Sequence, residues 1–122
     1  QWGIPTSAYE VARAIESVLD CYQQQKSFRR GIYHFASNGS YHRWKCALLI
    51  KTIMIEKGEI SSNFPLIPIK TASLHLPALR PKHAVLEHHV FEQTFSFTPE
   101  NWQDGVKRTV LNELGELKQS EK

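Results

Sequence analysis

The sequence predicts a small α/β domain of the α+β kind, with about three main helices and a few short strands. Two segments, residues 8–22 and 42–57, carry apolar residues in helical patterns. Between them, residues 31–36 are rich in β-formers and end in a turn signal. With 122 residues, 41% of them hydrophobic, the chain is large enough for one core and one domain.

The first helix has the strongest amphipathic pattern. Ser7 and Glu10 form a capping-box pattern at its start. We expect the charged side chains of Arg13, Glu16 and Asp20 to face water. The apolar residues that recur at helical spacing, and that we expect to face the core, are Ala8, Val11, Ala12, Ile15, Val18, Leu19 and Tyr22.

A buried strand is expected next, at residues 31–36, before the turn signal at residues 37–40. A second helix should cover residues 42–57 and stop at Gly58. Because this helix is apolar over much of its circumference, we expect it to be largely buried.

Prolines interrupt the region between residues 60 and 81 too often for a helix or a central strand. We expect a short strand near residues 66–69, an extended loop, and a short helix at residues 86–94. Thr98 and Pro99 predict the start of the last helix, since Thr caps helices and Pro suits the first helical position. Its expected inner face is Trp102, Val106, Val110, Leu114 and Leu117. The domain is expected to span residues 1–114, with a frayed charged tail at 115–122.

Composition excludes few functions. The net charge of +3 is spread along the chain, and its densest basic cluster, Lys26, Arg29 and Arg30, is interpreted as a solvated loop. The sequence lacks the interleaved basic and aromatic residues that are expected of a nucleic-acid-binding protein. No apolar run reaches the roughly 18 residues of a membrane span, so we expect a soluble, cytoplasmic protein. Cys21 and Cys46 are expected to be buried free thiols.

Tyr41 and Lys45 match the bare Tyr-x-x-x-Lys pattern of short-chain dehydrogenases, whose lysine helps to lower the tyrosine pKa for proton transfer. That chemistry needs a nicotinamide, and the chain has no glycine-rich fingerprint after a strand. We interpret the pair as an ordinary helix start, and we predict no catalytic and no cofactor-binding residue in this chain.

A histidine-rich segment is the second candidate for chemistry. His83, Glu87, His88 and His89 could supply metal ligands, but adjacent His88 and His89 point to different sides of a helix. No His-Glu-x-x-His pattern is present. An exposed helix face, without a metal site, is therefore the expectation.

Five groups of residues, in order along the chain, resemble a known family. They are Gln1, Gly3, Pro5 and Thr6; Gly31, Ile32, Tyr33 and His34; Leu76, Pro77, Ala78, Arg80 and Pro81; Leu86; and Trp102, Gly105, Val106, Lys107 and Arg108. This pattern is similar to the carboxy-terminal part of the dTDP-4-dehydrorhamnose reductases, which are extended short-chain dehydrogenases of the Rossmann type. The likeness covers Gln1 to about Leu114. The start at Gln1, with Gly3 and Pro5 close by, suggests a connection whose earlier half is missing.

The resemblance implies a C-terminal substrate-binding domain. Members of the family use NADPH or NADH to reduce dTDP-4-dehydro-L-rhamnose to dTDP-L-rhamnose, a precursor of surface polysaccharides. Their cofactor site and catalytic Tyr-x-x-x-Lys lie in an amino-terminal Rossmann part, which this sequence lacks. By position, the resemblance places Gln1, Pro5, Thr6 and Arg80 at the sugar-nucleotide side of the cleft. A structural salt bridge at Arg80, and simple helix initiation at Pro5 and Thr6, are the alternatives.

The sequence also departs from the family pattern. Ala84 and Val90 replace the usual Ser and Lys after Arg80, and Asn112 stands where some members carry a metal-binding carboxylate. Two functions remain open: a substrate-binding fragment that is inactive alone, or a non-catalytic regulatory module like the regulatory subunit of methionine adenosyltransferase. The expected partners are a dTDP-sugar and the Rossmann part, without nucleic acid or membrane, and an exposed docking surface could drive self-association.

Overall fold

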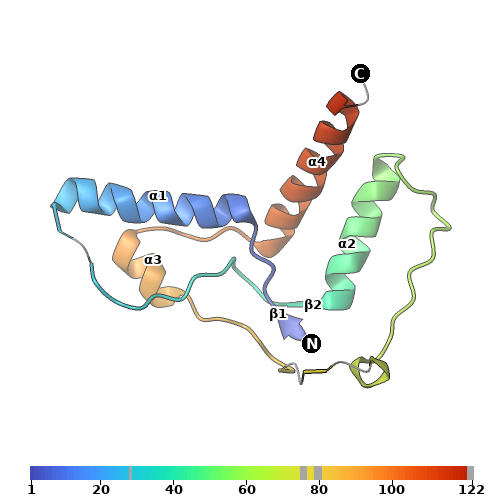
Figure 1. The fold of residues 1–122 in the computed structure, drawn as a ribbon, viewed down its shortest axis with the longest axis horizontal. Helices are drawn as coiled ribbons and strands as arrows, with labels where there is room; N and C mark the ends of the chain where they lie inside the picture. The colour runs from blue at the N-terminus through green and yellow to red at the C-terminus, as the bar shows by residue number, and fades with distance from the viewer. Residues whose placement is uncertain (28, 75–76, 79–80, 121–122) are drawn as a thin grey trace.

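The computed structural model describes residues 1–27, 29–74, 77–78 and 81–120, without the side chains of Ala72 and residues 116–120. These parts of the chain contain four α-helices, one 3₁₀ helix and a two-stranded sheet (Figure 1). Helix α1 lies above α3 on one side of the fold, and α2 and α4 stand side by side on the other. The fold is therefore a small α-rich fragment with few strands.

Helix α1 spans Ala8–Gln25 and begins as the sequence predicts. The Ser7 hydroxyl caps it by accepting a hydrogen bond from the Glu10 N–H at 3.2 Å. At its other end Lys26 adopts a left-handed conformation, and its N–H donates to the carbonyl of Tyr22.

The face that α1 buries is not the one that its apolar pattern predicts. Fully buried positions are Glu10 and Ala14, and Val18 and Cys21 pack partly against the core. Most of the expected inner face is exposed to solvent instead, at Ala8, Val11, Ala12, Ile15, Leu19 and Tyr22. The prediction of the core-facing side was wrong for these residues, because the described part of the fold packs against a different stripe of the helix.

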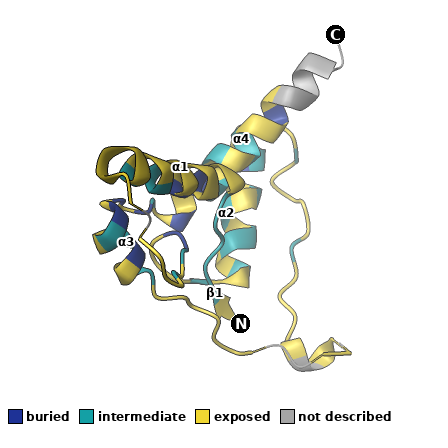
Figure 2. Cartoon of the chain, turned by 60° about the vertical axis from the view of Figure 1, so that its left-hand side comes forward, coloured by how far each residue is buried: buried dark blue, intermediate teal, exposed yellow. Residues whose placement is uncertain are grey.

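An aromatic cluster forms the main core. Ala14 of α1 packs against Phe91 and Phe95 of α3 (His89–Phe95) and against Phe97. In Figure 2 the buried residues gather where α1, α3 and the start of α4 approach one another. This cluster binds the first third of the chain to its last third. The short helix predicted at residues 86–94 exists, but it starts later.

Residues 31–36 do not form the predicted strand, although their alternation is that of one. Tyr33 and Phe35 point into the aromatic cluster, at ring-centroid distances of 5.0 Å from Phe95 and Phe91 respectively. Ile32 is 92% exposed. The segment has no regular secondary structure, and within the described residues no neighbouring strand pairs with it.

A charged junction connects the starts of α1 and α4 (Trp102–Ser120). The buried Glu10 carboxylate accepts from the backbone N–H of Glu100 at 2.7 Å and from Arg13 at 3.3 Å. Glu100 in turn is ion-paired with Arg108, and the hydrogen bond from Arg108 to Glu100 raises the pKa of that guanidinium. The Arg108 guanidinium also lies over the Tyr9 ring, 4.5 Å from its centroid.

The junction explains why α4 begins after the predicted start at Thr98 and Pro99. The N–H of Glu100 is bonded to Glu10, and its carbonyl accepts from Asn38 at 2.7 Å. Both backbone groups are therefore used across the fold, and the chain becomes helical only at Trp102. Of the predicted inner face of α4, Trp102 and Leu114 are buried and Val106 and Val110 half-buried, and the side chain of Leu117 lies outside the described residues.

Helix α2 spans Arg43–Glu56 and packs on α4. Gly58 follows with a φ of 74°, in agreement with the predicted stop. The prediction that α2 is largely buried was wrong: only Ile53 is fully buried, and Leu48 and Ile50 are exposed. Helix α4 packs on one side of α2, and the described residues leave much of the remaining apolar circumference of α2 uncovered.

The predicted strand at residues 66–69 is absent, and the chain runs there without regular structure to a short 3₁₀ helix at Thr71–Ser73. The sheet forms elsewhere, between β1 (Trp2–Gly3) and β2 (Tyr41–His42). Cys21 and Cys46 are free thiols, both half-buried, and burial raises the pKa of the Cys46 thiol. Among the described helices, none has the length and apolarity needed to cross a membrane.

Candidate functional site

Gln1 borders two hollows at the point where β1, β2 and α2 meet. The smaller, of about 270 Å³, is also lined by Tyr41, Arg43, Pro81 and Ala84. The larger, of about 640 Å³, lies between α2 and the segment that leads to the 3₁₀ helix. Both volumes are near or within the range usual for small-molecule sites. Arg43 lines both hollows, so they share its positive charge.

Local pairing holds this region in place. Trp2 pairs with His42 and Gly3 with Tyr41 in the antiparallel sheet, which brings Gln1 beside the first turn of α2. On the other side of β1, the N–H of Trp2 donates to the Lys82 carbonyl at 2.8 Å. The Trp2 ring stacks on His83 with an interplanar angle of 3°. The first residues are thereby held between two distant segments of the chain.

The larger hollow combines cations with an apolar wall. Arg43 and Lys70 supply positive charge, and the positive end of the α2 dipole lies at the same place, because α2 begins at Arg43. Among the described residues that line it there is no carboxylate. The remaining lining residues are mostly apolar or aromatic: Trp44, Ala47, Leu66, Ile67, Pro68, Ile69 and Leu74, with Gln1, His42 and Thr71. Such a hollow suits an anionic ligand that also carries a flat or apolar group.

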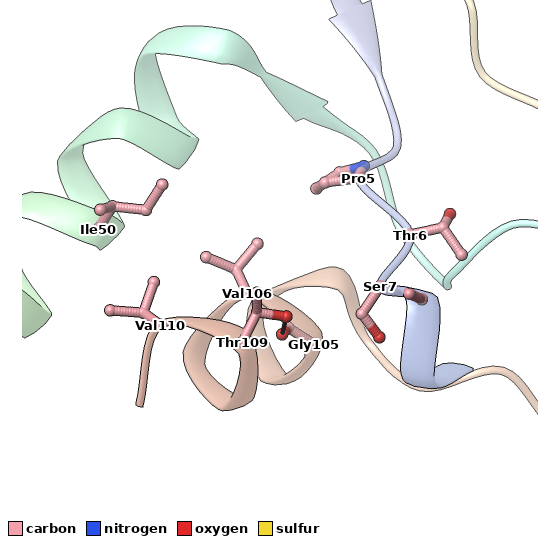
Figure 3. A pocket seen from close by; sticks show the side chains of 9 residues that line it. Pro5, Thr6, Ser7, Ile50, Gly105, Val106, Thr109 and Val110 are labelled. Carbon is pink, nitrogen blue, oxygen red and sulfur yellow. Dashed lines mark hydrogen bonds between the residues drawn. The ribbon is translucent and has the colours of Figure 1, made fainter. Parts of the chain in front are cut away.

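Pro5 and Thr6 lie at a different hollow, of about 320 Å³, formed by α2, α4 and the start of α1 (Figure 3). Its other lining residues are Ser7, Ala8, Ile50, Gly105, Val106, Thr109 and Val110. The Thr6 hydroxyl accepts a hydrogen bond from the Ser37 N–H at 3.1 Å, so this side chain also connects the segment before α1 to the turn at residue 37. The described residues that line this hollow are apolar or carry hydroxyl groups, and none of them is a cation that could bind a diphosphate.

The structure therefore separates the residues that the resemblance placed at one cleft. Gln1 belongs to the hollows beside Arg43, and Pro5 and Thr6 to the hollow beside α4. Arg80 lies outside the described residues. Arg43, Trp44 and Lys70 were not among the predicted site residues, because neither periodicity nor a short motif connects residues 43–44 with residue 70. A cation at the first turn of a helix was the only signal in the sequence.

Tyr41 and Lys45 do not sit on one helix as the dehydrogenase pattern requires. Tyr41 is the first residue of β2, and its ring packs against Trp102 with centroids 5.3 Å apart, whereas the exposed Lys45 belongs to α2. This geometry agrees with our interpretation that the Tyr-x-x-x-Lys match is coincidental. Tyr41, however, lies in a strand and not at the start of a helix as we expected.

The histidine-rich segment is not the helix face that we expected. His83 lies in an isolated bridge with Trp2, and the carboxylate of Glu87 accepts from the His89 N–H at 2.9 Å. Only His89 belongs to α3. Within the part of the chain that the structure describes, no three His, Cys, Asp or Glu side chains gather as metal ligands would.

Comparison with known proteins defines the class. A family model described as the RmlD substrate binding domain matches residues 1–114. The chain therefore belongs to the RmlD substrate-binding domain family.

Its relatives are dTDP-4-dehydrorhamnose reductases. The enzyme of Escherichia coli K12 is 31% identical in an alignment 118 residues long that covers 93% of this chain and 38% of that protein. The enzyme of Burkholderia thailandensis is 25% identical in an alignment 121 residues long that covers 95% of this chain and 41% of that protein. The chain thus spans about two fifths of the length of the relatives that it matches.

A solved structure shares the fold. The crystal structure of dTDP-4-dehydrorhamnose reductase from Bacillus anthracis, in complex with NADP, superposes with a TM-score of 0.69 at 20% identity. The superposition covers 92% of this chain and 36% of that enzyme. The likeness extends over nearly all of the present chain, and it concerns the fold.

Proposed function

We propose that this chain is the substrate-binding part of an NAD(P)H-dependent reductase that converts dTDP-4-dehydro-L-rhamnose to dTDP-L-rhamnose in the cytoplasm, and that it is not catalytic alone. The observation that carries the proposal is the family match over residues 1–114. The sequence agrees with it, since it contains neither a glycine-rich cofactor fingerprint nor a Tyr-x-x-x-Lys pair on one helix.

The larger hollow at Gln1 is the part of the proposed site that the described residues support best. A dTDP-sugar carries a diphosphate, which needs cations, and a thymine ring, which stacks on aromatic side chains. Arg43 and Lys70 could neutralise the diphosphate, and Trp44 and the apolar wall could hold the base or the sugar. Arg80 remains a proposed diphosphate contact on the resemblance alone.

The remaining chemistry would come from elsewhere in the complete protein. NADPH or NADH, bound by a Rossmann-type part, would supply the hydride, and a tyrosine of that part would supply the proton. In the proposal the present residues bind and orient the sugar nucleotide, and Gln1, Pro5 and Thr6 lie near the boundary with that part. The partners are thus the dTDP-sugar and the Rossmann part, with no nucleic acid and no membrane.

Calorimetric titration with dTDP-rhamnose tests the proposal. We expect weak binding to the 122-residue chain, because half a cleft leaves the ligand partly solvated. Arg43→Ala should weaken that binding at least about tenfold, as expected for the loss of one charge-assisted contact. The matched control is Arg29→Ala, whose guanidinium is exposed and far along the chain from the hollow.

Two results would contradict the proposal. One is an absence of dTDP-rhamnose binding together with binding to a protein partner, which would favour the regulatory module. The other is oxidation of NADPH with dTDP-4-dehydro-L-rhamnose by this chain alone. If Arg43→Ala leaves the affinity for dTDP-rhamnose unchanged and Arg80→Ala lowers it, the diphosphate contact belongs to Arg80 in the proline-rich loop and not to Arg43.

A further inference from the structure

Three flat side chains lie side by side near the start of the chain. The antiparallel pairing of β1 with β2 sets Trp2 opposite His42, and a parallel bridge sets Trp2 opposite His83 on its other side. Paired residues of neighbouring strands point to the same face of a sheet. Trp2, His42 and His83 therefore share one face, and we call these three side chains the aromatic row.

Backbone hydrogen bonds fix the register of the aromatic row. The N–H of Trp2 donates to the Lys82 carbonyl at 2.8 Å, and the Trp2 carbonyl accepts from the Ala84 N–H at 2.9 Å. These two bonds hold His83 opposite Trp2. Because the three segments are far apart in the sequence, no periodicity or short motif indicates the row.

The rings form a flat surface with a wall on one side. The planes of Trp2 and His83 differ by only 3°, with centroids 6.4 Å apart, so a planar ligand that stacks on one ring is parallel to the other. The ring of His42 stands at 78° to Trp2, at a centroid distance of 5.8 Å, and forms the wall. All three side chains are exposed, Trp2 by 39%. A large ring that the backbone holds in place and leaves exposed offers area for stacking.

The aromatic row borders a cation of the proposed site. Trp2 lines the smaller hollow and His42 the larger one, and Arg43 lines both. An anionic group that binds to Arg43 thus lies next to the row. A nucleotide combines the two properties, since its phosphates need a cation and its base offers a flat ring.

We propose that the aromatic row binds the base of the nucleotide, and that it accepts purine and pyrimidine bases alike. The inference rests on the proposed function, which it deepens by assigning the base to Trp2 and His83. Trp44 and the apolar wall of the larger hollow are then left to the sugar.

The tolerance for different bases follows from the kind of contact. Stacking does not depend on base identity, because every base has a π face. Discrimination between bases needs hydrogen bonds to the base edge. The ring nitrogens of His42 are already engaged by the chain, since Nδ1 accepts from the Trp44 N–H at 3.4 Å and Nε2 lies 3.4 Å from the Gln1 nitrogen.

Calorimetric titration with four ligands at one pH tests the aromatic row. The ligands are dTDP, UDP, GDP and inorganic pyrophosphate, and the ratio of the dTDP affinity to the pyrophosphate affinity reports the contribution of the base. Trp2→Leu should lower this ratio at least about fivefold, the low end for the loss of one stacking partner. Arg43→Ala should weaken the binding of all four ligands. The matched control is Tyr22→Leu, which replaces a ring 37% exposed on α1 that lines neither hollow, and it should change no affinity.

The same titrations test the tolerance for different bases. The affinities for dTDP, UDP and GDP should lie within about fivefold of one another, and a wider spread would overturn the tolerance. His83→Ala should lower the affinity for GDP more than that for dTDP, because a purine has two rings and covers more of the parallel pair. This variant leaves the pairing of Trp2 with His42 in place, so it also tests the row if circular dichroism shows that Trp2→Leu does not fold.

The outcomes separate this inference from the proposed function. A ratio that neither Trp2→Leu nor His83→Ala changes, in variants with native-like circular dichroism, would overturn the aromatic row and leave the phosphate contact of the proposed function standing. So would a ratio that Trp44→Leu alone lowers, since the base would then lie in the larger hollow. Nucleotide binding that depends on Trp2, together with no binding of dTDP-rhamnose, would contradict the proposed function alone. Absence of binding of all four ligands would contradict both.

Discussion

The two sides of α1 differ in what covers them. On the inner side, Ala14 and Cys21 pack against a cluster of phenylalanines, and Glu10 is fully buried with its hydrogen bonds made. On the outer side, Ile15 and Leu19 are more than half exposed. The more apolar side is the less buried one. An apolar stripe thus indicates that a face needs cover, but it does not say that the same chain supplies it.

The difference also shows what orients the helix. The inner side is defined by a buried carboxylate with specific partners, which cannot be exchanged for another acceptor without loss. The outer side offers only apolar area, which any sufficiently flat apolar surface can cover. Substitutions on the two sides should therefore have effects of different size on the chain alone.

The largest expected effect is on the inner side, at Glu10. Glu10→Ala should lower the free energy of unfolding by about 2–3 kcal/mol, because the Glu100 N–H loses its buried acceptor. Urea unfolding followed by circular dichroism measures the change. Glu16→Ala, at an exposed position of the same helix, should stay within about 0.5 kcal/mol of the wild type. Similar losses in the two variants would refute the anchoring role of Glu10.

An intermediate effect is expected for two glycines of α4. A Cβ at Gly105 would lie 2.9 Å from a carboxylate oxygen of Glu100, which Ser7 and Arg108 already hold. Gly105→Ala should therefore destabilise the chain by about 1 kcal/mol, although Ala is the better helix former. At Gly115 a Cβ meets nothing within 4 Å, so Gly115→Ala should stabilise it by about 0.5–1 kcal/mol. Thermal unfolding distinguishes the signs, and a stabilising Gly105→Ala would mean that the junction is loose.

The smallest effect is expected on the outer side. Ile15→Ala removes a side chain that is 56% exposed and gains helix propensity, so the unfolding free energy should change by less than about 0.5 kcal/mol. Its counterpart one residue earlier, Ala14→Leu, places a larger side chain against the phenylalanine cluster and should cost about 1–3 kcal/mol. If Ile15→Ala proves the costlier of the two, the assignment of inner and outer sides is reversed.

Sequence reasoning succeeded where the controlling interactions are local. The Ser7 cap, the stop of α2 at Gly58 and the existence of the main helices depend on residues a few positions apart. The family, too, could be identified from the order and spacing of Gln1, Gly31 and Trp102 with their neighbours, and the match over residues 1–114 confirms it.

Contacts between residues far apart in the sequence determined the features that sequence reasoning missed. The delayed start of α4 depends on Glu10, ninety residues earlier in the chain than Glu100. The hollow at Gln1 depends on the meeting of Arg43 with Lys70, which no periodicity could indicate. The predicted strand at residues 31–36 keeps its alternation but has no paired neighbour among the described residues, because pairing is a property of two segments.

By itself, the sequence determined which segments become helical and which family the chain belongs to. Caps, apolar spacing and the order of motifs all depend on the order of residues along the chain. The tertiary structure decided which side of each helix is buried and which cations share a hollow. The physical reason is that burial and charge pairing depend on the partner that arrives from elsewhere.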